Sequence, residues 1–73
     1  MRDIEVRSEV TGTVWKLVAE AGAKLAKDDV ILIVESMKME IPVVAPSGGV
    51  LQSLEVAEGD LVEEGQLVGR ISP

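Results

Sequence analysis

Apolar residues recur with a spacing of three and then two in two separate parts of the chain. These positions are Val14, Leu17 and Ala19 in the first part and Leu51, Leu54 and Val56 in the second. A plain strand would keep a spacing of two, because its side chains alternate between the faces of a sheet. One extra residue, a β-bulge, would return all three side chains to one face. An amphipathic helix is the alternative, but the β-branched residues and bounding glycines favour two bulged strands.

Both patterns belong to an internal repeat. The segment "GTVWKLVAEAGAKLAKDDVILIV" at 12–34 aligns with "GVLQSLEVAEGDLVEEGQLVGRI" at 49–71, an offset of 37 residues. Gly22 and Gly59 fall in register, and both are expected in turns with a positive φ. Asp28 occupies the place of Gly65 and is expected to adopt the same backbone conformation at some cost.

Eight extended segments follow from these patterns. They are Ile4–Ser8, Thr13–Ala19, Lys24–Ala26, Val30–Glu35, Met39–Ala45, Val50–Val56, Leu61–Glu63 and Gln66–Ser72. We therefore predict one all-β domain over residues 1–73, with two similar sheets that face each other across a pseudo-twofold axis. The absence of any third copy distinguishes this arrangement from a solenoid.

The stretch "VESMKMEIPV" at 34–43 contradicts ordinary turn chemistry. The chain is expected to reverse between Glu35 and Glu40, because a single strand from Val30 to Ala45 would be far too long. A tight hairpin favours Asn-Gly or Asp-Gly, yet this one must use Met37 and Lys38 or their neighbours. A non-glycine residue in the left-handed region costs roughly 1–2 kcal/mol. A sequence kept at that cost indicates a role outside the fold.

The repeat also locates this turn. Shifted by 37 residues, Lys38 corresponds to Met1 or to a position just past Pro73. Lys38 is therefore expected at one end of the domain and both termini at the other.

Composition narrows the classes of function. Thirteen acidic and seven basic residues give a net charge of −6, which disfavours nucleic-acid and anionic membrane partners. The chain has no histidine, no cysteine and no glycine-rich phosphate loop, so an independent enzyme is not expected. No signal peptide or membrane-spanning run is recognisable. We expect a cytoplasmic monomer, or a mitochondrial or plastid matrix location if the chain is cut from a longer one.

The segment "ESMKME" at 35–40, the segment "GDLVEEGQLV" at 59–68 and the half-length repeat resemble the biotinyl/lipoyl attachment domain family. The resemblance spans roughly Ile4 to Ser72. It points to the biotin carboxyl carrier branch and to short stand-alone biotin/lipoyl attachment proteins. It implies a flattened barrel, or barrel-sandwich hybrid, of two four-stranded antiparallel sheets. Ser36 stands where the family motif Ala-Met-Lys-Met has alanine, and the short loop at Glu20–Ala23 leaves no room for the protruding "thumb" of some bacterial carriers.

The resemblance also implies the chemistry. A biotin protein ligase would join biotin to Lys38, and the arm would then carry an activated carboxyl group between a biotin carboxylase and a carboxyltransferase. The domain itself would be a non-catalytic carrier. Residues expected to be read by the ligase or another partner are Met37, Met39, Glu35, Glu40 and Ser36.

Each of these hairpin residues also has an ordinary structural interpretation. Lys38 could be a solvated turn lysine, Met37 and Met39 could fill the core, and the glutamates could serve solubility alone. A lipoyl carrier of a 2-oxo acid dehydrogenase-type complex is an alternative, but that branch typically has Asp-Lys-Ala around its lysine. An unmodified adaptor module is a second alternative, and it would need no special lysine hairpin. Trp15 is expected to face outward and is given no role.

Overall fold

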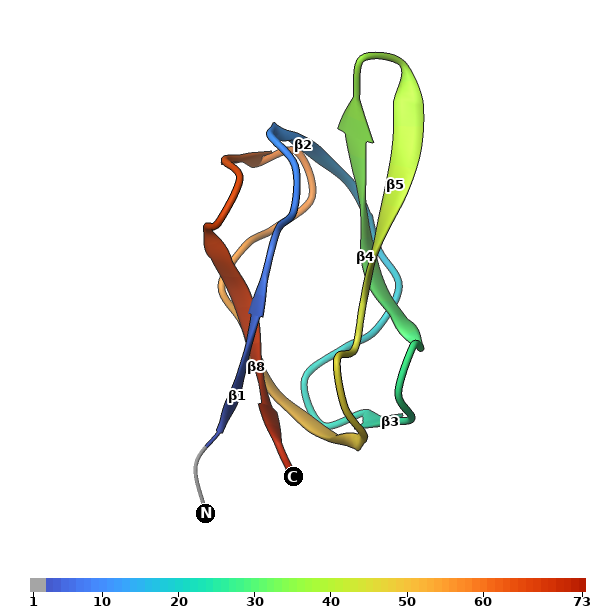
Figure 1. Ribbon diagram of the computed structural model, residues 1–73, viewed down its shortest axis with the longest axis vertical. Helices are drawn as coiled ribbons and strands as arrows, with labels where there is room; N and C mark the ends of the chain where they lie inside the picture. The colour runs from blue at the N-terminus through green and yellow to red at the C-terminus, as the bar shows by residue number, and fades with distance from the viewer. Residues whose placement is uncertain (1–2) are drawn as a thin grey trace.

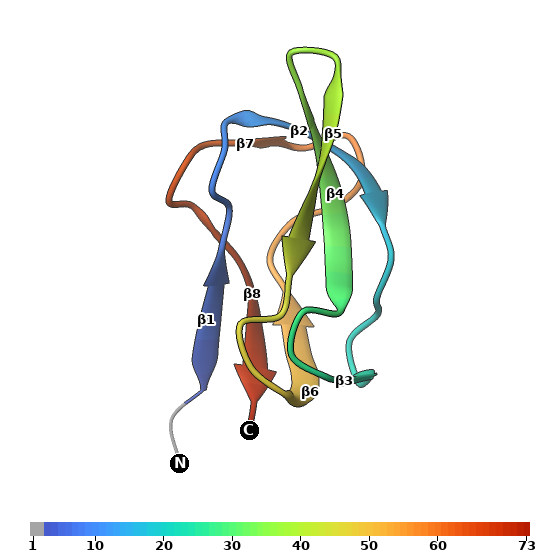
Figure 2. The ribbon, with the colours of Figure 1, turned by 45° about the vertical axis from the view of Figure 1, so that its right-hand side comes forward.

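The computed structural model describes residues 3–73, and this part of the chain contains strands but no helix. The strands are β1 (Ile4–Arg7), β2 (Gly12–Leu17), β3 (Lys24–Leu25), β4 (Val30–Ser36), β5 (Met39–Val44), β6 (Gly49–Leu54), β7 (Leu61–Val62) and β8 (Leu67–Ser72). They form two antiparallel four-stranded sheets, in the orders β1-β8-β6-β3 and β5-β4-β2-β7 (Figures 1 and 2). Residues 3–73 accordingly contain no helix able to cross a membrane.

The repeat in the sequence is a repeat in space. The 37-residue offset converts β5, β4, β2 and β7 into β1, β8, β6 and β3, which is the order of the other sheet. Each sheet therefore combines strands from both copies: β3 of the first copy pairs with β6 of the second, and β7 of the second pairs with β2 of the first. Because the copies are interlocked in this way, neither could bury its apolar face alone. The predicted pseudo-twofold arrangement of two facing sheets is confirmed.

Both predicted bulges are present. The register of β2 against β4 shifts between Val14 and Lys16, and that of β6 against β8 shifts between Leu51 and Ser53. Val14 and Leu51 are fully buried, and Ala19 is also part of the core. The extra residue thus returns the unevenly spaced apolar side chains to the inner face, as the spacing predicts.

Several strands are shorter than the sequence predicts. β2 ends at Leu17 rather than Ala19, because the backbone N–H groups of Val18 and Ala19 both donate to the carbonyl of Ile31, at 2.9 Å each. Two donors on one acceptor break the ladder, so the strand pairing stops there. In the second copy β6 also ends early, at Leu54, two residues before the expected Val56.

The turns adopt the backbone conformations that the sequence predicts. Gly22 and Gly59 have φ of 97° and 91°. Asp28 has φ of 74° and matches its counterpart Gly65 at 86°. The aspartate therefore occupies a left-handed position that the other copy gives to glycine.

The core lies between the two sheets and is built from aliphatic side chains. Its members are Val6, Val14, Ala19, Leu25, Ile31, Leu32, Val34, Val43, Ala45, Leu51, Val56, Val62, Val68 and Ile71. No aromatic side chain takes part, since Trp15, the one aromatic residue, is 49% exposed. The expected outward position of Trp15 is confirmed.

The domain is elongated, with extents of 36 × 18 × 17 Å. The β4–β5 hairpin forms one end of the long axis and projects beyond the neighbouring strands (Figure 1). β1 begins and β8 ends at the opposite end (Figures 1 and 2). The hairpin that carries Lys38 thus lies at the opposite end of the domain from the start of β1 and the end of β8, as the repeat predicts, while Met1 itself lies outside the described residues.

Candidate functional site

The hairpin between β4 and β5 turns on two residues. Met37 and Lys38 have φ of 51° and 66°, and Ser36 lies opposite Met39 in the last pair of the ladder. Two successive residues with positive φ are the signature of a type I′ turn, whose twist matches that of the flanking strands. Neither residue is glycine, so each left-handed position costs roughly 1–2 kcal/mol. The prediction that the chain reverses at Met37 and Lys38 is confirmed.

Lys38 offers an accessible primary amine at the tip of the domain. Its side chain is exposed, and within residues 3–73 it makes no ion pair. The left-handed turn fixes its Cα in space, while the four-carbon stem leaves the ammonium free to move. An amine so presented can form an amide with a carboxylic-acid cofactor such as biotin. The geometry therefore fits covalent attachment.

Both methionines beside Lys38 lie in solvent. Met37 is 93% exposed and Met39 is 64% exposed. Such exposure rules out the interpretation of these side chains as core filler, because neither belongs to the buried cluster. Large apolar side chains held in water at a turn, on a flexible thioether stem, make an adaptable contact surface.

Ser36 anchors the end of the hairpin next to the turn. Its hydroxyl donates to the carbonyl oxygen of Thr11 at 2.9 Å, and the hydroxyl of Thr11 accepts from the backbone N–H of Glu64 at 3.1 Å. This chain of bonds ties the hairpin to the segment before β2 and to the loop after β7. Thr11 and Glu64 were missed by sequence reasoning, because no periodicity or spacing relates either residue to Ser36.

Glu35 and Glu40 stand directly opposite each other on β4 and β5. Both side chains are exposed, and within residues 3–73 neither forms an ion pair. Like charges at opposed positions of a sheet destabilise it by a fraction of a kcal/mol, up to about 1 kcal/mol. Glu35 lies three residues before Lys38 and Glu40 two residues after it, so the hairpin presents one amine with two carboxylates beneath it.

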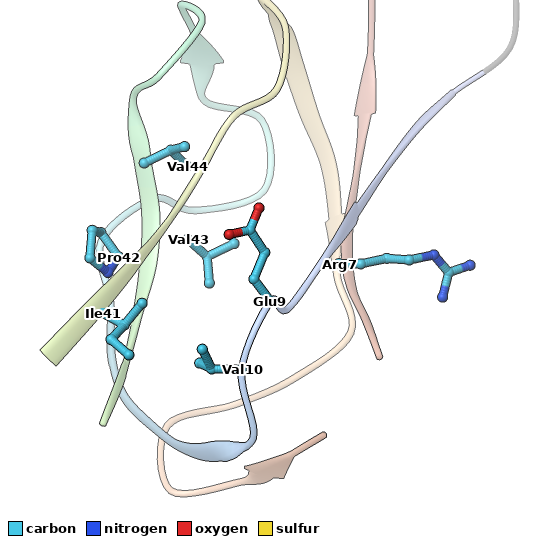
Figure 3. A pocket seen from close by; sticks show the side chains of 7 residues that line it. All are labelled: Arg7, Glu9, Val10, Ile41, Pro42, Val43 and Val44. Atoms are coloured by element: carbon cyan, nitrogen blue, oxygen red, sulfur yellow. The ribbon is translucent and has the colours of Figure 1, made fainter. Parts of the chain in front are cut away.

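A small pocket lies lower on β5 and takes no part in this arrangement. It is lined by Arg7, Glu9, Val10, Ile41, Pro42, Val43 and Val44, and it includes none of the residues from 35 to 40 (Figure 3). The side chain of Arg7 extends away from it, and its guanidinium donates to the carbonyl of Gly65 and to Glu5, both at 2.8 Å. The carboxylate of Glu9 is therefore the charged group that remains at the pocket.

Truncating either methionine tests whether it acts in recognition. Met37→Ala and Met39→Ala should each change the free energy of unfolding by no more than about 0.5 kcal/mol, because both side chains are exposed. Each should nevertheless slow modification of Lys38 by a ligase. Chemical melts and ligase assays on the same preparations separate the two effects. A stability loss of about 2–5 kcal/mol with an unchanged ligase rate would show that they pack in the core instead.

Comparison with known proteins adds to this geometry. The family described as "Biotin-requiring enzyme" matches residues 5–71. A biotinylated protein TB7.3 homolog of Mycobacterium leprae is 40% identical over 68 residues, which cover 93% of this chain and 96% of the relative. The solved structure of the urea carboxylase of Kluyveromyces lactis superposes with a TM-score of 0.94 and 36% identity, over 99% of this chain and 6% of that chain.

A second solved structure has the same fold. The lipoyl domain of the 2-oxoglutarate dehydrogenase complex from Azotobacter vinelandii superposes with a TM-score of 0.79 and 26% identity, over 96% of both chains. The predicted two-sheet fold is confirmed by both superpositions.

Proposed function

This chain belongs to the biotin/lipoyl attachment family, and we propose that it is a biotin carboxyl carrier that holds biotin on Lys38. The observation that carries the proposal is the Met37–Lys38 turn: an exposed amine on a glycine-free hairpin, flanked by two methionines in solvent. The relative from Mycobacterium leprae, which is described as biotinylated, matches along nearly its whole length and supports the same assignment.

The role of Lys38 is attachment and reach. A biotin protein ligase joins the carboxyl group of biotin to the Nζ of Lys38 as an amide, with ATP as the energy source. The amide carries no charge, so the arm can enter an enzyme site without burying an ammonium, which would be costly. Biotin, when attached, supplies the group-carrying chemistry that no side chain of this domain can supply.

The rest of the hairpin positions that arm. The left-handed backbone at Met37 and Lys38 sets the direction in which the lysine leaves the domain. The hydrogen bond from Ser36 to Thr11 restrains the end of the hairpin next to the turn. Because β1 begins and β8 ends at the far end of the long axis, a tether or neighbouring domain attached there leaves the tip free (Figure 1).

We infer that the partners are a biotin protein ligase, a biotin carboxylase and a carboxyltransferase. The likeness to a segment of urea carboxylase supports a carboxylase setting. Within that setting the domain contributes effective concentration: a tethered arm converts the meeting of biotin with each active site into a local event. The domain acts as an attachment module rather than as a catalyst.

A lipoyl carrier is the second candidate, favoured by the superposition on a lipoyl domain. The methionines on both sides of Lys38 oppose it, because the lipoyl branch typically places aspartate and alanine there. The biotin assignment therefore remains the one that the hairpin supports better.

Label transfer tests the function. The protein is biotinylated with ligase, ATP and biotin, and is then incubated with a biotin carboxylase, ATP and labelled bicarbonate. We expect label on the protein at a ratio approaching one per chain, and none when biotin is omitted from the first step. Biotinylated protein that never acquires label from any of several biotin carboxylases would contradict the carrier role.

A further inference from the structure

The outer face of the sheet β5-β4-β2-β7 carries an apolar stripe that the core does not use. Pro42 of β5 lies opposite Ile33 of β4, which in turn lies opposite Lys16 of β2. The bulge between Val14 and Lys16 places Trp15 beside the same row. Trp15 is 49% exposed and Pro42 is exposed, while Ile33 is half-buried between them. These three residues, the outer stripe, cross three adjacent strands on the solvent side of the sheet.

The repeat provides the same surface on the opposite sheet, where the residues are polar. The counterparts of the three stripe residues are Gln52, Arg70 and Glu5. Glu5 and Arg70 are opposed in register, and their charged groups lie 3.8 Å apart. Arg7 donates to Glu5 at 2.8 Å, and this bond with its positive charge holds the pKa of Glu5 below the ordinary value. The position equivalent to Arg7 is Val44, which is 37% exposed.

The difference between the two outer faces shows that folding alone does not explain the apolar residues of the outer stripe. The two sheets share strand order, bulge positions and core packing, so the fold does not require an apolar outer face on either. Exposed apolar side chains grouped on one face often mark an interaction site. Only the sheet with the apolar face also carries the Lys38 hairpin. The outer stripe is therefore associated with the function of the Lys38 hairpin.

The charges above the stripe indicate the nature of the partner. Glu35 and Glu40 form the next row toward the turn, directly opposed and exposed. Within residues 3–73 no cation pairs with them, so their repulsion is uncompensated in the free domain. A partner surface that places Lys or Arg against this row would remove the repulsion and gain a charge-assisted contact. The complementary surface is thus apolar, with a basic edge.

We propose that the outer stripe, together with the acidic pair above it, is the surface on which the biotin protein ligase docks to reach Lys38. This inference rests on the proposed function. Pro42 is four residues from Lys38, or about 13 Å along β5, so one compact enzyme surface can cover the stripe and the turn together.

The ligase is favoured over the other partners by reach. It acts on Lys38 before any cofactor arm exists, so the amine itself, four methylene groups from its Cα, must meet the reacting atoms. The ligase must therefore contact the hairpin and the sheet beside it. An enzyme that acts on attached biotin has the added length of the cofactor, and it can stand further from the sheet. A docking face within one hairpin length of Lys38 fits the first case.

Kinetics with exchanged residues test the proposal. The triple variant Trp15→Gln, Ile33→Arg, Pro42→Glu gives the hairpin sheet the residues that the opposite sheet carries at the equivalent positions, and it leaves the turn intact. With this carrier as the varied substrate of the ligase, we expect KM to rise about tenfold or more, because a central apolar anchor is lost. The kcat should change little, because docking contacts are made equally in the ground and transition states. Circular dichroism checks that the variant folds.

Two further variants make the result decisive. Trp15→Gln alone alters an exposed side chain without risk to the core, and its KM should rise several-fold. The control, Gln52→Ala with Arg70→Ala, changes the equivalent surface of the opposite sheet and should keep the wild-type KM. An unchanged KM in the folded triple variant overturns the proposal. Analytical sedimentation gives a second contradicting result. If the wild type is a dimer, and the triple variant is a monomer with an unchanged KM, the stripe joins two copies of this chain and does not dock the ligase.

The same assay separates this inference from the proposed function. If the wild-type protein is never biotinylated, the proposed function fails and the docking face fails with it. If the wild type is biotinylated and the folded triple variant is modified with the same KM, the docking face alone is wrong.

Discussion

Replacing Lys38 with arginine is expected to abolish biotin attachment completely while leaving the protein folded. Arginine keeps the charge and most of the length of lysine, but its guanidinium is not a nucleophile that a ligase can convert to an amide. Lys38 is exposed at the turn, so Lys38→Arg should change the free energy of unfolding by less than about 0.5 kcal/mol. Streptavidin blotting after incubation with ligase, ATP and biotin measures the loss, and a urea melt measures the stability.

The control uses two other lysines of the chain. Lys24→Arg and Lys27→Arg alter exposed residues away from both the turn and the outer stripe, and each should be biotinylated as fast as the wild type. A Lys38→Arg protein that still binds streptavidin would place the attachment elsewhere. In that case the conformation of the hairpin would need another explanation.

Gly12→Ala is expected to cause the largest loss of stability among the single substitutions considered for this chain. A Cβ at Gly12 would press against the carbonyl oxygen of Glu35 and lie 2.9 Å from Cγ1 of Val34. The first of these atoms is backbone, so β2 and β4 must separate to make room. Overpacking typically costs 1–3 kcal/mol, and a backbone clash should reach or exceed about 3 kcal/mol. That is a large part of the roughly 4–11 kcal/mol expected for a domain of this size.

Gly65→Ala serves as the matched comparison. Gly65 has φ of 86°, but an added Cβ there meets no atom within 4 Å. The cost should be confined to backbone conformation, roughly 1–2 kcal/mol. Urea unfolding of both variants, with slopes equal to that of the wild type, gives the two losses. Equal losses would show that close approach of β2 to β4 is not what requires glycine at position 12.

Much of the fold was predictable because the two halves of the chain can be aligned with each other. The uneven spacing at Val14 and Leu17 predicts a bulge, and its repetition 37 residues later predicts a second sheet of the same design. The positions at which strands stop pairing, by contrast, depend on backbone hydrogen bonds that cannot be predicted from residue types. The expected end of β2 was too far along the chain because Val18 and its neighbour share a single acceptor, the carbonyl of Ile31.

The candidate site was predictable at the turn and less so around it. Met37 and Lys38 were identified because they are poor turn formers placed where the chain must reverse, and a conflict of this kind marks a residue kept for function. The bond from Ser36 to Thr11 was not predictable, because it joins segments with no shared pattern. The outer stripe was missed for a different reason: Trp15 stands alone in the sequence, and only the strand register brings it beside Ile33.

The measurement that tests the account most directly is the intact mass of the protein purified from cells that contain a biotin protein ligase, followed by peptide mapping. The account predicts one biotinyl group per chain, on the peptide that contains Lys38, with every other lysine unmodified. A lipoyl group on Lys38, biotin on a different lysine, or an unmodified chain in cells where other carriers are biotinylated would contradict it.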